Sequence, residues 1–375
     1  MKSTRLAPHS RYSPRRKIAL LLPGHNEELI IATTIRSAIA SGQKKRDIFV
    51  VNDASTDATR RIAEELLGKQ NVLSVHRSGK ALAVQKAIKK FEIEKYYQWL
   101  HVADADSIFS PEYFRIYRRS LSPEYAVAVG FVQSLRGNWI STYRSLTYTY
   151  SQHFNRRIQS YFQMVSVLPG PITSFRTDIL SQLETDETSL TEDFDITIQI
   201  YRKKLGKIKF IPKAINYTQD PQNLRDFYNQ NLRWQRGFFQ GVKKYGIGRH
   251  AQRIDVSLGF QMLQTILLFL ELLVILPFQL IVSHNWMIIP VAFTVDIIIN
   301  GLIAVGSSVV TKRWALLGSL PYFYFLRWLE ISIYVRASFE VLVLNKFNTK
   351  TKGWSTEGRR YKLDDAALVD IAGKS

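Results

Sequence analysis

The stretch YQWLHVADADS, residues 97–107, joins an apolar run to two carboxylates that lie two residues apart. The apolar run is typical of a buried parallel strand, and Asp104 and Asp106 follow directly at its end. A single D-x-D string is most often a solvated loop with two surface acids. The alternative is a divalent metal site that faces a phosphorylated ligand, and the surrounding elements decide between the two.

Strand-like and helix-like segments alternate through the first half of the chain. Compact apolar runs predict strands, and 3.6-residue spacing with polar starts and glycine ends predicts helices. The strands are expected at 17–23, 47–53, 71–76 and 97–104, with helices at 26–42, 55–68 and 80–95 between them. This alternation predicts an α/β domain with a mostly parallel sheet and helices on both faces.

The pattern continues less regularly beyond residue 120. We expect a strand at 125–133, an aromatic-rich helix at 141–162, a strand, Gly-Pro turn and helix within 164–180, a helix at 189–206, a short strand at 207–212 and a basic, aromatic helix at 223–246. That last helix is one that could lie flat on a bilayer.

Polar side chains follow three separate strands of the predicted sheet. His25 and Glu27 come after the first strand, Asp53 ends the second, and Asp104 and Asp106 end the fourth. Right-handed crossovers place the carboxyl ends of parallel strands along one edge, where ligands bind in such sheets. A surface-loop interpretation does not predict this convergence, so we favour the metal site.

Charge and cysteine content restrict the partners. The chain of 375 residues has 51 Lys and Arg against 31 Asp and Glu, a formal net charge of +20, and no cysteine. Disulfides and thiolate metal sites are therefore excluded. A basic chain can bind nucleic acid or an anionic membrane surface. The apolar C-terminal third favours membrane lipids, and we predict no nucleic-acid partner.

Three apolar segments occupy that C-terminal third. Residues 256–282 and 286–310 are long enough to cross a bilayer. The third, 314–344, contains Arg327, Glu330, Arg336 and Glu340, which make a lipid-facing span costly. We expect two spans, with the third segment a hairpin, a re-entrant piece or an interfacial helix; a buried helical bundle is the alternative. Basic flanks predict a multi-pass cell-membrane protein whose globular part faces the cytoplasm.

These observations divide the chain into five parts. The predicted parts are a disordered basic arm at 1–16, a cytoplasmic catalytic domain at 17–220, an interfacial amphipathic region at 221–250, a transmembrane helical region at 251–344 and a basic cytoplasmic tail at 345–375.

A set of motifs along the chain resembles one enzyme family. In order they read PGHNEE, VVNDASTD, SGKALAVQKA, ADADSIFSP, LPGPITSFR, TEDFD and QNLRW. Together they resemble the family-2 inverting glycosyltransferases of the membrane-bound polysaccharide synthase type, which include cellulose, chitin, hyaluronan and poly-N-acetylglucosamine synthases. The resemblance covers roughly residues 17–245. It implies a GT-A type nucleotide-sugar-binding fold and a UDP-sugar donor.

The resemblance also assigns roles at the donor end. It implies that Asp106 binds Mg²⁺ or Mn²⁺, hard cations that suit oxygen ligands and a departing diphosphate. It implies donor contacts for the residues that match the family's motifs: Pro23, His25, Glu27, Asp53, Lys80, Asp104, Gln230 and Arg233. Asn52-Asp53 stands where the family usually has an Asp-Asp pair.

At the acceptor end the resemblance points to Asp193 of TED as the general base. An acceptor hydroxyl is a poor nucleophile, and a positioned carboxylate can remove its proton as it attacks the anomeric carbon. Taken alone, acids in a first helical turn are merely favourable there. The acceptor-side residues implied by the resemblance are Gly170, Phe175, Arg176, Glu192 and Trp234.

The sequence therefore predicts a membrane-bound transferase that adds sugars from a UDP-sugar to a growing β-linked polysaccharide. The first alternative is a non-processive enzyme with a lipid acceptor, which the small number of apolar segments favours. A non-catalytic membrane protein with a degenerate transferase domain is the second. A membrane partner that completes a channel fits the first interpretation.

Overall fold

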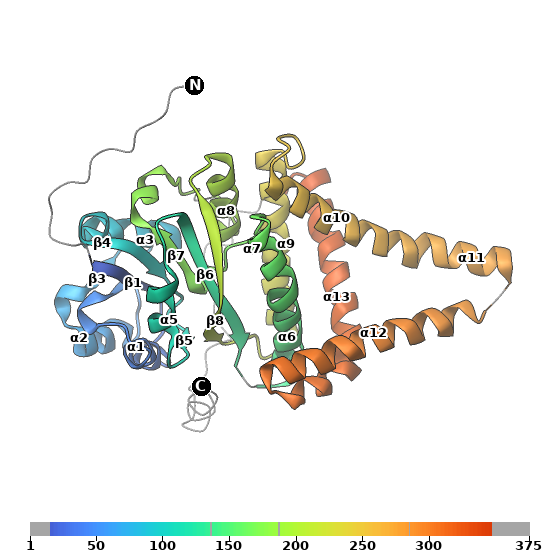
Figure 1. The fold of residues 1–375 in the computed structure, drawn as a ribbon, viewed down its shortest axis with the longest axis horizontal. Coiled ribbons are helices and arrows are strands. Elements are labelled where there is room, and N and C mark those ends of the chain that lie inside the picture. The colour runs from blue at the N-terminus through green and yellow to red at the C-terminus, as the bar shows by residue number, and fades with distance from the viewer. Residues whose placement is uncertain (1–15, 136, 187, 285, 347–375) are drawn as a thin grey trace.

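The computed structural model describes residues 16–135, 137–186, 188–284 and 286–346 (Figure 1). The predicted basic arm lies outside the described residues except for Arg16, and the predicted tail does so except for Asn345 and Lys346.

A single eight-stranded sheet forms the centre of the globular part. Its strands are β1 (Arg16–Gly24), β2 (Ile48–Asp53), β3 (Val72–Val75), β4 (Tyr97–Val102), β5 (Ile108–Phe109), β6 (Tyr125–Ser134), β7 (Thr173–Arg176) and β8 (Lys207–Thr218). The order is β3-β2-β1-β4-β7-β6-β8-β5, and only β7 and β5 run antiparallel to their neighbours. The four predicted N-terminal strands are confirmed, in a mostly parallel sheet.

Helices cover both faces of the sheet, as predicted. The alternation along β1 divides the core, because Leu20 and Leu22 enter one apolar cluster and Ala19 and Leu21 the other. The first cluster is closed by α1 (Ile31–Ala40), α2 (Thr59–Leu67) and α5 (Tyr113–Ser120). The second is closed by α3 (Lys80–Lys90), α4 (Ile93–Tyr96), the 3-10 segment η5 (Thr177–Gln182) and α8 (Glu192–Arg202).

The segment 164–180 differs from its prediction. The expected strand before the Gly-Pro turn does not form; Leu168 N–H instead donates to Thr197 Oγ1 at 2.9 Å. The strand lies after the turn, as β7, which fills the space between β4 and β6. The short strand expected at 207–212 is also longer, because β8 pairs with β6 through two register shifts. Both errors arise from sheet neighbours that are distant in sequence.

The predicted aromatic helix at 141–162 is three helical pieces in succession. They are α6 (Trp139–Tyr150), the π-helical turn η3 (Ser151–Arg156) and α7 (Arg157–Tyr161). Asn138 caps α6 by accepting from the N–H groups of Ile140 and Ser141. The predicted helix at 223–246 is α9 (Leu224–Tyr245), which Asn223 caps in the same way.

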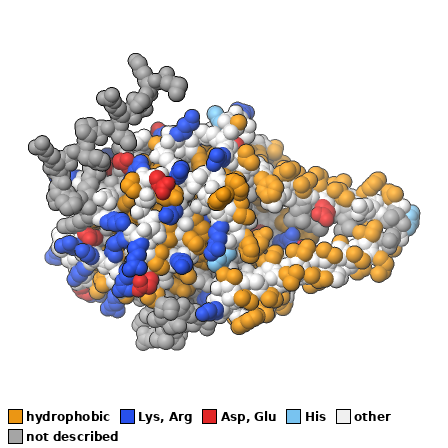
Figure 2. Space-filling model, in the orientation of Figure 1, with side chains coloured by type: hydrophobic (Ala, Val, Ile, Leu, Met, Phe, Trp, Pro, Cys, Tyr) orange, Lys and Arg blue, Asp and Glu red, His pale blue; other side chains and the backbone are white. Residues whose placement is uncertain are grey.

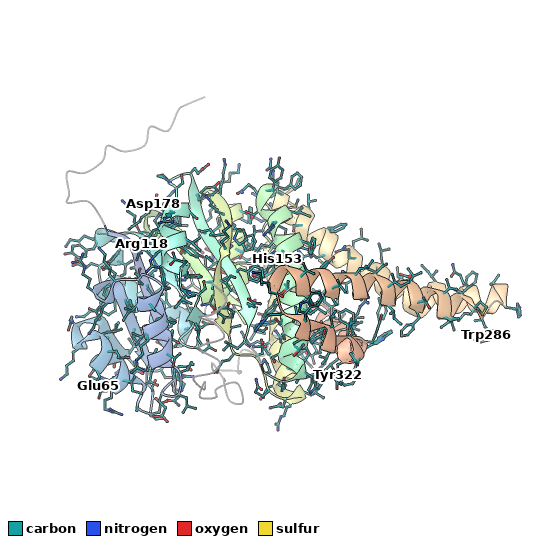
Figure 3. The ribbon with its side chains drawn as sticks, turned by 60° about the horizontal axis from the view of Figure 1, so that its bottom comes forward. Glu65, Arg118, His153, Asp178, Trp286 and Tyr322 are labelled. Carbon is teal, nitrogen blue, oxygen red and sulfur yellow. The ribbon has the colours of Figure 1, made fainter. Side chains whose placement is uncertain are left out.

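Two helical arms project from the globular part (Figure 1). The first is α10 (Arg253–Leu270), the π-helical turn η6 (Glu271–Ile275) and α11 (Leu276–Ser283), and the second is α12 (Ile288–Thr311). Their surfaces are apolar and exposed (Figure 2), with Phe260, Phe278, Phe293 and Leu302 among the exposed side chains. Trp286 lies at the tip where the arms meet (Figure 3).

The two predicted spans differ from each other in the structure. Among the described residues, α12 is the one helix that is long and apolar enough to cross a membrane. The expected first span, 256–282, is divided by η6, and Pro277 follows at the start of α11. No single helix within that segment therefore meets the same criterion.

The third apolar segment packs against the globular part. It forms η7 (Trp314–Ser319), α13 (Leu320–Ser338) and η8 (Phe339–Val343), and Ile333 and Ala337 share an apolar cluster with Leu232 of α9. Its charges are partnered as well. The Arg327 guanidinium lies 3.2 Å from Asp296, and the Glu330 carboxylate accepts from the Tyr143 hydroxyl at 2.8 Å. This segment therefore packs on α9 of the globular part.

Candidate active site

The ends of β1 and β2 are fastened to each other and to the loop before α3. His25 Nδ1 lies 2.8 Å from the backbone oxygen of Asp53, whose carboxylate is fully buried. That carboxylate accepts the N–H groups of Ser78 at 2.7 Å and Gly79 at 3.0 Å. Gly79 has a φ of 79°, which an L side chain rarely adopts. Asp53 therefore sets the point at which α3 begins. Pro23 and Glu27 are also buried.

Lys80, the first residue of α3, joins the two predicted acidic motifs. Its ammonium group is hydrogen-bonded to Asp104 and lies 3.7 Å from the Glu192 carboxylate. Burial opposes the charge on Lys80, but the two carboxylates outweigh burial and raise the pKa of the ammonium above its usual range. The structure thus brings DAD and TED together around one cation, although they lie almost ninety residues apart in sequence.

Asp104 and Asp106 form a turn after β4 in which Ser107 N–H donates to Asp104 O at 3.0 Å. Among the described residues, no group of three or more His, Asp or Glu side chains could hold a metal ion alone. The donor set nevertheless fits Mg²⁺ or Mn²⁺. Such ions are commonly held by one or two carboxylates and take their other ligands from substrate phosphates and water. Asp106 is 8% exposed and the Asp104 side chain is 32% exposed.

The three acids of TEDFD have different surroundings in α8. Burial and the adjacent Glu192 carboxylate raise the pKa of Asp193 to about 6, against the influence of Lys80 and Arg233. One Asp193 oxygen accepts the Phe194 N–H at 2.9 Å. Asp195, by contrast, is 4% exposed and accepts from Lys244 and Tyr245. A carboxyl group with a raised pKa beside a pocket is suited to proton transfer near neutral pH.

The Q-x-x-R-W residues lie on one face of α9, next to the start of α8. Arg233 donates to the backbone oxygen of Leu190 at 2.9 Å, just before TED. Gln230 accepts from Arg144 at 2.7 Å, and the Trp234 ring lies 4.8 Å from the guanidinium of the same arginine. All three predicted residues are half-buried, and Arg233 is the one that contacts the segment before α8.

Arg144, which the sequence analysis did not single out, contacts two of the predicted site residues, Gln230 and Trp234. It is 2% exposed on α6, donates to Tyr148 as well as to Gln230, and also faces the ring of Phe227. Its position supports the two motif residues Gln230 and Trp234. The only signal in the sequence is an arginine inside an otherwise aromatic and hydroxyl-rich helix.

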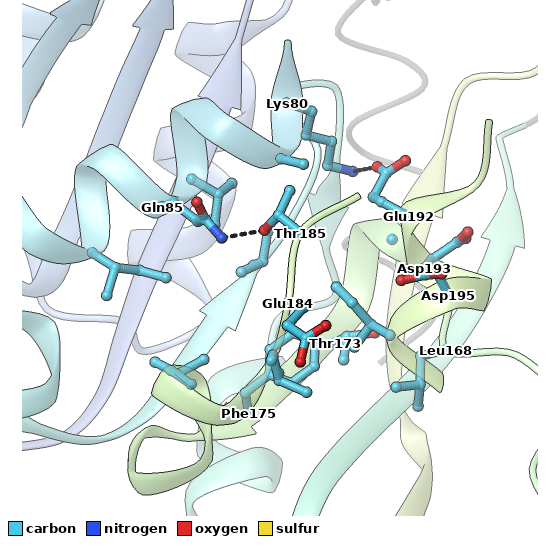
Figure 4. Close-up of a pocket in the computed structure, with 18 of the residues that line it drawn as sticks. Lys80, Gln85, Leu168, Thr173, Phe175, Glu184, Thr185, Glu192, Asp193 and Asp195 are labelled. Carbon is cyan, nitrogen blue, oxygen red and sulfur yellow. Dashed lines mark hydrogen bonds and ion pairs between the residues drawn. The ribbon is translucent and has the colours of Figure 1, made fainter. Parts of the chain in front are cut away.

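A pocket lies beneath Lys80 and beside α8 (Figure 4). Four of the residues predicted for the acceptor side or the base line it, namely Gly170, Phe175, Glu192 and Asp193. A Cβ on Gly170 would lie 3.0 Å from Lys80 Nζ, so the glycine admits the lysine.

Two of the residues predicted for the acceptor side are not among those that line this pocket. One is Trp234, whose ring faces Arg144, and the other is Arg176. It lies at the far end of β7, opposite Trp99. There it binds Asp178 at 2.6 Å and the Pro123 oxygen.

Comparisons with known proteins agree with this arrangement. Residues 14–237 match the family model described as glycosyltransferase like family 2. A probable glycosyltransferase of Bacillus subtilis, YdaM, is 28% identical over 248 residues, which are 61% of this chain and 57% of the relative. The poly-β-1,6-N-acetyl-D-glucosamine synthase of Staphylococcus aureus (strain COL) is 23% identical over 227 residues, 59% of this chain and 54% of the relative. The chain spans about half the length of the curated relatives it matches.

A solved structure has a similar fold over nearly the whole chain. The mannosyltransferase PcManGT from Pyrobaculum calidifontis, in complex with GDP-Man and Mn²⁺, superposes with a TM-score of 0.52 at 16% identity, covering 92% of both chains. At this identity the likeness concerns the fold. It agrees with the predicted GT-A type arrangement of sheet and helices.

Proposed function

The chain belongs to the family 2 glycosyltransferases, and on this premise we propose that it transfers a sugar from a UDP-sugar to a hydroxyl of a growing β-linked glycan. The observation that carries the proposal is the contact of Lys80 with both Asp104 and Glu192. Through it, the end of β4, where a donor diphosphate is expected, lies against the helix that bears Asp193. A donor and an acceptor hydroxyl can thus meet between the two motifs.

The donor half of the proposal rests on the strand ends. Pro23, His25 and Glu27, with Asp53, line the nucleoside side. Asp104 contacts the nucleotide, and Lys80, Gln230 and Arg233 supply positive or hydrogen-bonding groups to the diphosphate. Bound Mg²⁺ or Mn²⁺, held by Asp106 beside Asp104, would stabilise the charge that develops on the leaving UDP. The Mn²⁺ in the PcManGT complex supports this choice of cation.

The acceptor half rests on α8 and α9. Asp193 takes the proton of the acceptor hydroxyl as that oxygen attacks the anomeric carbon. One displacement inverts the anomer, so an α-linked donor yields a β-glycoside. Trp234 offers an aromatic face to a pyranose ring, and Glu192, Gly170 and Phe175 border the acceptor. The raised pKa of Asp193 supports the role of a base that works near neutral pH.

We place the enzyme in the cell membrane with its catalytic domain on the cytoplasmic side. The exposed apolar surfaces of both arms support insertion, since monomeric soluble proteins rarely expose such large continuous patches. In this arrangement α10 and α11 cross the membrane and α12 crosses back. The chain then returns to the same side of the membrane as the globular part. α13, packed on α9, then lies at the membrane surface.

A lipid acceptor is the second candidate. α13 packs against α9 instead of extending into the arms, so the described residues supply few helices for a glycan channel. A non-processive transfer to a membrane lipid needs no channel, whereas polysaccharide secretion by this chain would require a membrane partner to complete one.

The test is a transfer assay with purified protein in nanodiscs and a panel of radiolabelled UDP-sugars, with and without Mn²⁺. UDP release and labelled product are expected with one donor, most strongly UDP-N-acetylglucosamine or UDP-glucose. Parallel arms with a β-linked oligosaccharide and with a polyprenyl lipid separate the two candidates. Absence of UDP binding in the presence of Mn²⁺ would contradict the proposal and favour a non-catalytic protein. A nucleic-acid-binding role predicts a gel shift with a steep salt dependence instead.

A further inference from the structure

Lys244, near the C-terminal end of α9, connects two acids that flank Glu192 and Asp193 in the chain. Its ammonium lies 2.7 Å from an Asp195 oxygen and 2.8 Å from an Asp186 oxygen. The Tyr245 hydroxyl donates to the same Asp195 oxygen at 2.7 Å. Since Asp195 is 4% exposed, this cation offsets a charge that is otherwise costly to bury.

The same face of α9 also binds Leu190, which precedes Asp193 in the chain. Besides the bond from Arg233 to the Leu190 oxygen, Gln240 Oε1 accepts the Leu190 N–H at 3.1 Å. Residues 233, 240 and 244 are spaced by seven and four positions, which places them on one side of a helix. Three side chains of α9 thus bind Asp186, Leu190 and Asp195.

Two glycines allow α9 to approach this closely. A Cβ at Gly237 would lie 2.2 Å from Thr191 Oγ1, and one at Gly241 would lie 2.4 Å from Phe194 Cε1. Both glycines lie on the face that bears Gln240 and Lys244. The first turn of α8 therefore sits directly on α9, with Asp193 between the contact at Thr191 and the contact at Asp195.

We propose that Lys244 is a positioning residue for the transfer reaction: by clamping Asp186 and Asp195 it fixes the orientation in which Asp193 meets the acceptor hydroxyl. The inference rests on the proposed function, because Asp193 acts as a base only if transfer occurs. The clamp touches neither Asp104 nor Lys80, so it acts on the chemical step and leaves donor binding alone. A displacement of about 1 Å at a catalytic group can cost on the order of 10²-fold in rate.

The decisive variant is Lys244→Met in the full chain in nanodiscs, assayed with the best UDP-sugar and Mn²⁺. We expect kcat to fall on the order of 10²-fold with the KM for the UDP-sugar unchanged. Lys244→Arg, which keeps the charge and can bridge both carboxylates, should restore most of kcat. The matched control is Lys243→Met, because the neighbouring lysine contacts Asn345 instead. A normal kcat in Lys244→Met, or a loss confined to KM, would overturn the proposal.

A milder variant keeps the test valid if Lys244→Met does not fold. Asp186→Asn removes the outer half of the clamp and leaves the Lys244–Asp195 pair in place. It should lower kcat less than Lys244→Met, again at constant KM, and an unchanged kcat would count against the clamp. Failure of the proposed function gives a different result, since the wild-type protein would then show no Mn²⁺-dependent transfer from any UDP-sugar.

Discussion

The donor end and the acceptor end of this site are held in place by different means. At the donor end, side chains bind backbone groups of adjoining strand ends, as His25 and Asp53 do. At the acceptor end, side chains on separate helices bind one another, as Lys244 of α9 and Asp195 of α8 do across 49 residues of sequence. Sheet topology positions the first set, because parallel strands end on one edge. The acceptor-end residues are held by buried polar contacts between helices. Single substitutions there should therefore change both the stability and the activity of the protein.

The largest difference between the donor end and the acceptor end is expected when the effects of Asp193→Asn and Asp106→Asn on transfer and on UDP binding are compared. Loss of the base should lower transfer by about 10²–10⁴-fold while UDP binding with Mn²⁺ stays near the wild-type level. Asp106→Asn should abolish transfer by weakening Mn²⁺-dependent UDP binding itself. Calorimetric titration of UDP with Mn²⁺, beside the transfer assay, measures both. Normal transfer by Asp193→Asn would disprove the assignment of the base.

The next largest effect is expected at the junction between α8, which carries the proposed base, and the first arm. Arg202 of α8 makes two hydrogen bonds to the Asp255 carboxylate, at 2.8 and 2.6 Å, and the side chains are 13% and 3% exposed. Arg202→Met leaves Asp255 buried without its cation, which typically costs about 3–5 kcal/mol. We expect a clearly lower urea midpoint of unfolding for the detergent-solubilised protein. An unchanged midpoint would mean that the arm and α8 are joined by apolar packing alone.

The same contrast explains how much could be predicted from the sequence. The strands, the covering helices and the convergence of Asp53, Asp104 and Asp106 follow from local patterns of apolar runs and terminal acids. The position of β7 could not be predicted, because it depends on its neighbours in the sheet.

Local pattern also fails within TEDFD. Glu192, Asp193 and Asp195 look alike in sequence, yet of these three only Asp195 accepts hydrogen bonds from Lys244 and Tyr245. Arg144 was missed for the same reason, since Phe227, Gln230 and Trp234, three of its partners, lie on α9. Such pairings depend on which helices pack against each other in the fold. The spacing of residues along the sequence does not predict them.

A smaller effect is expected where α9 crosses α8. Gly237→Val would drive a side chain into Thr191, an overpacking that typically costs about 1–3 kcal/mol and displaces the start of α8. We expect a lower unfolding midpoint together with reduced kcat. Gly259→Ala is the control, because a Cβ there has nothing within 4 Å. Equal behaviour of the two variants would show that the crossing tolerates a side chain.

The pH dependence of transfer tests the electrostatics of the base. Asp193 must be ionised to accept a proton, and its pKa of about 6 predicts a rate that falls about tenfold per pH unit below that value. The raised pKa means that the folded state binds the proton more tightly than the unfolded chain. Protonation of Asp193 between its ordinary range and pH 6 therefore favours folding. Single-turnover rates and unfolding midpoints over pH 5–8 should show a rate loss without a matching loss of stability from this group. A flat rate between pH 5 and 7 would contradict the assignment.

The smallest effect is expected on the outer surface of the donor end. Arg61 and Glu65 of α2 lie 2.7 Å apart, but their side chains are 68% and 60% exposed. Exposed pairs at this helical spacing contribute about 0.3–0.5 kcal/mol, because water and salt screen the charges. Arg61→Ala should therefore leave both transfer and the urea midpoint almost unchanged, roughly a tenth of the effect of Arg202→Met. If Arg61→Ala and Arg202→Met were equally destabilising, burial would not distinguish the donor end from the acceptor end. The long-range ion pairs around α8 would then contribute no more to stability than those on the surface.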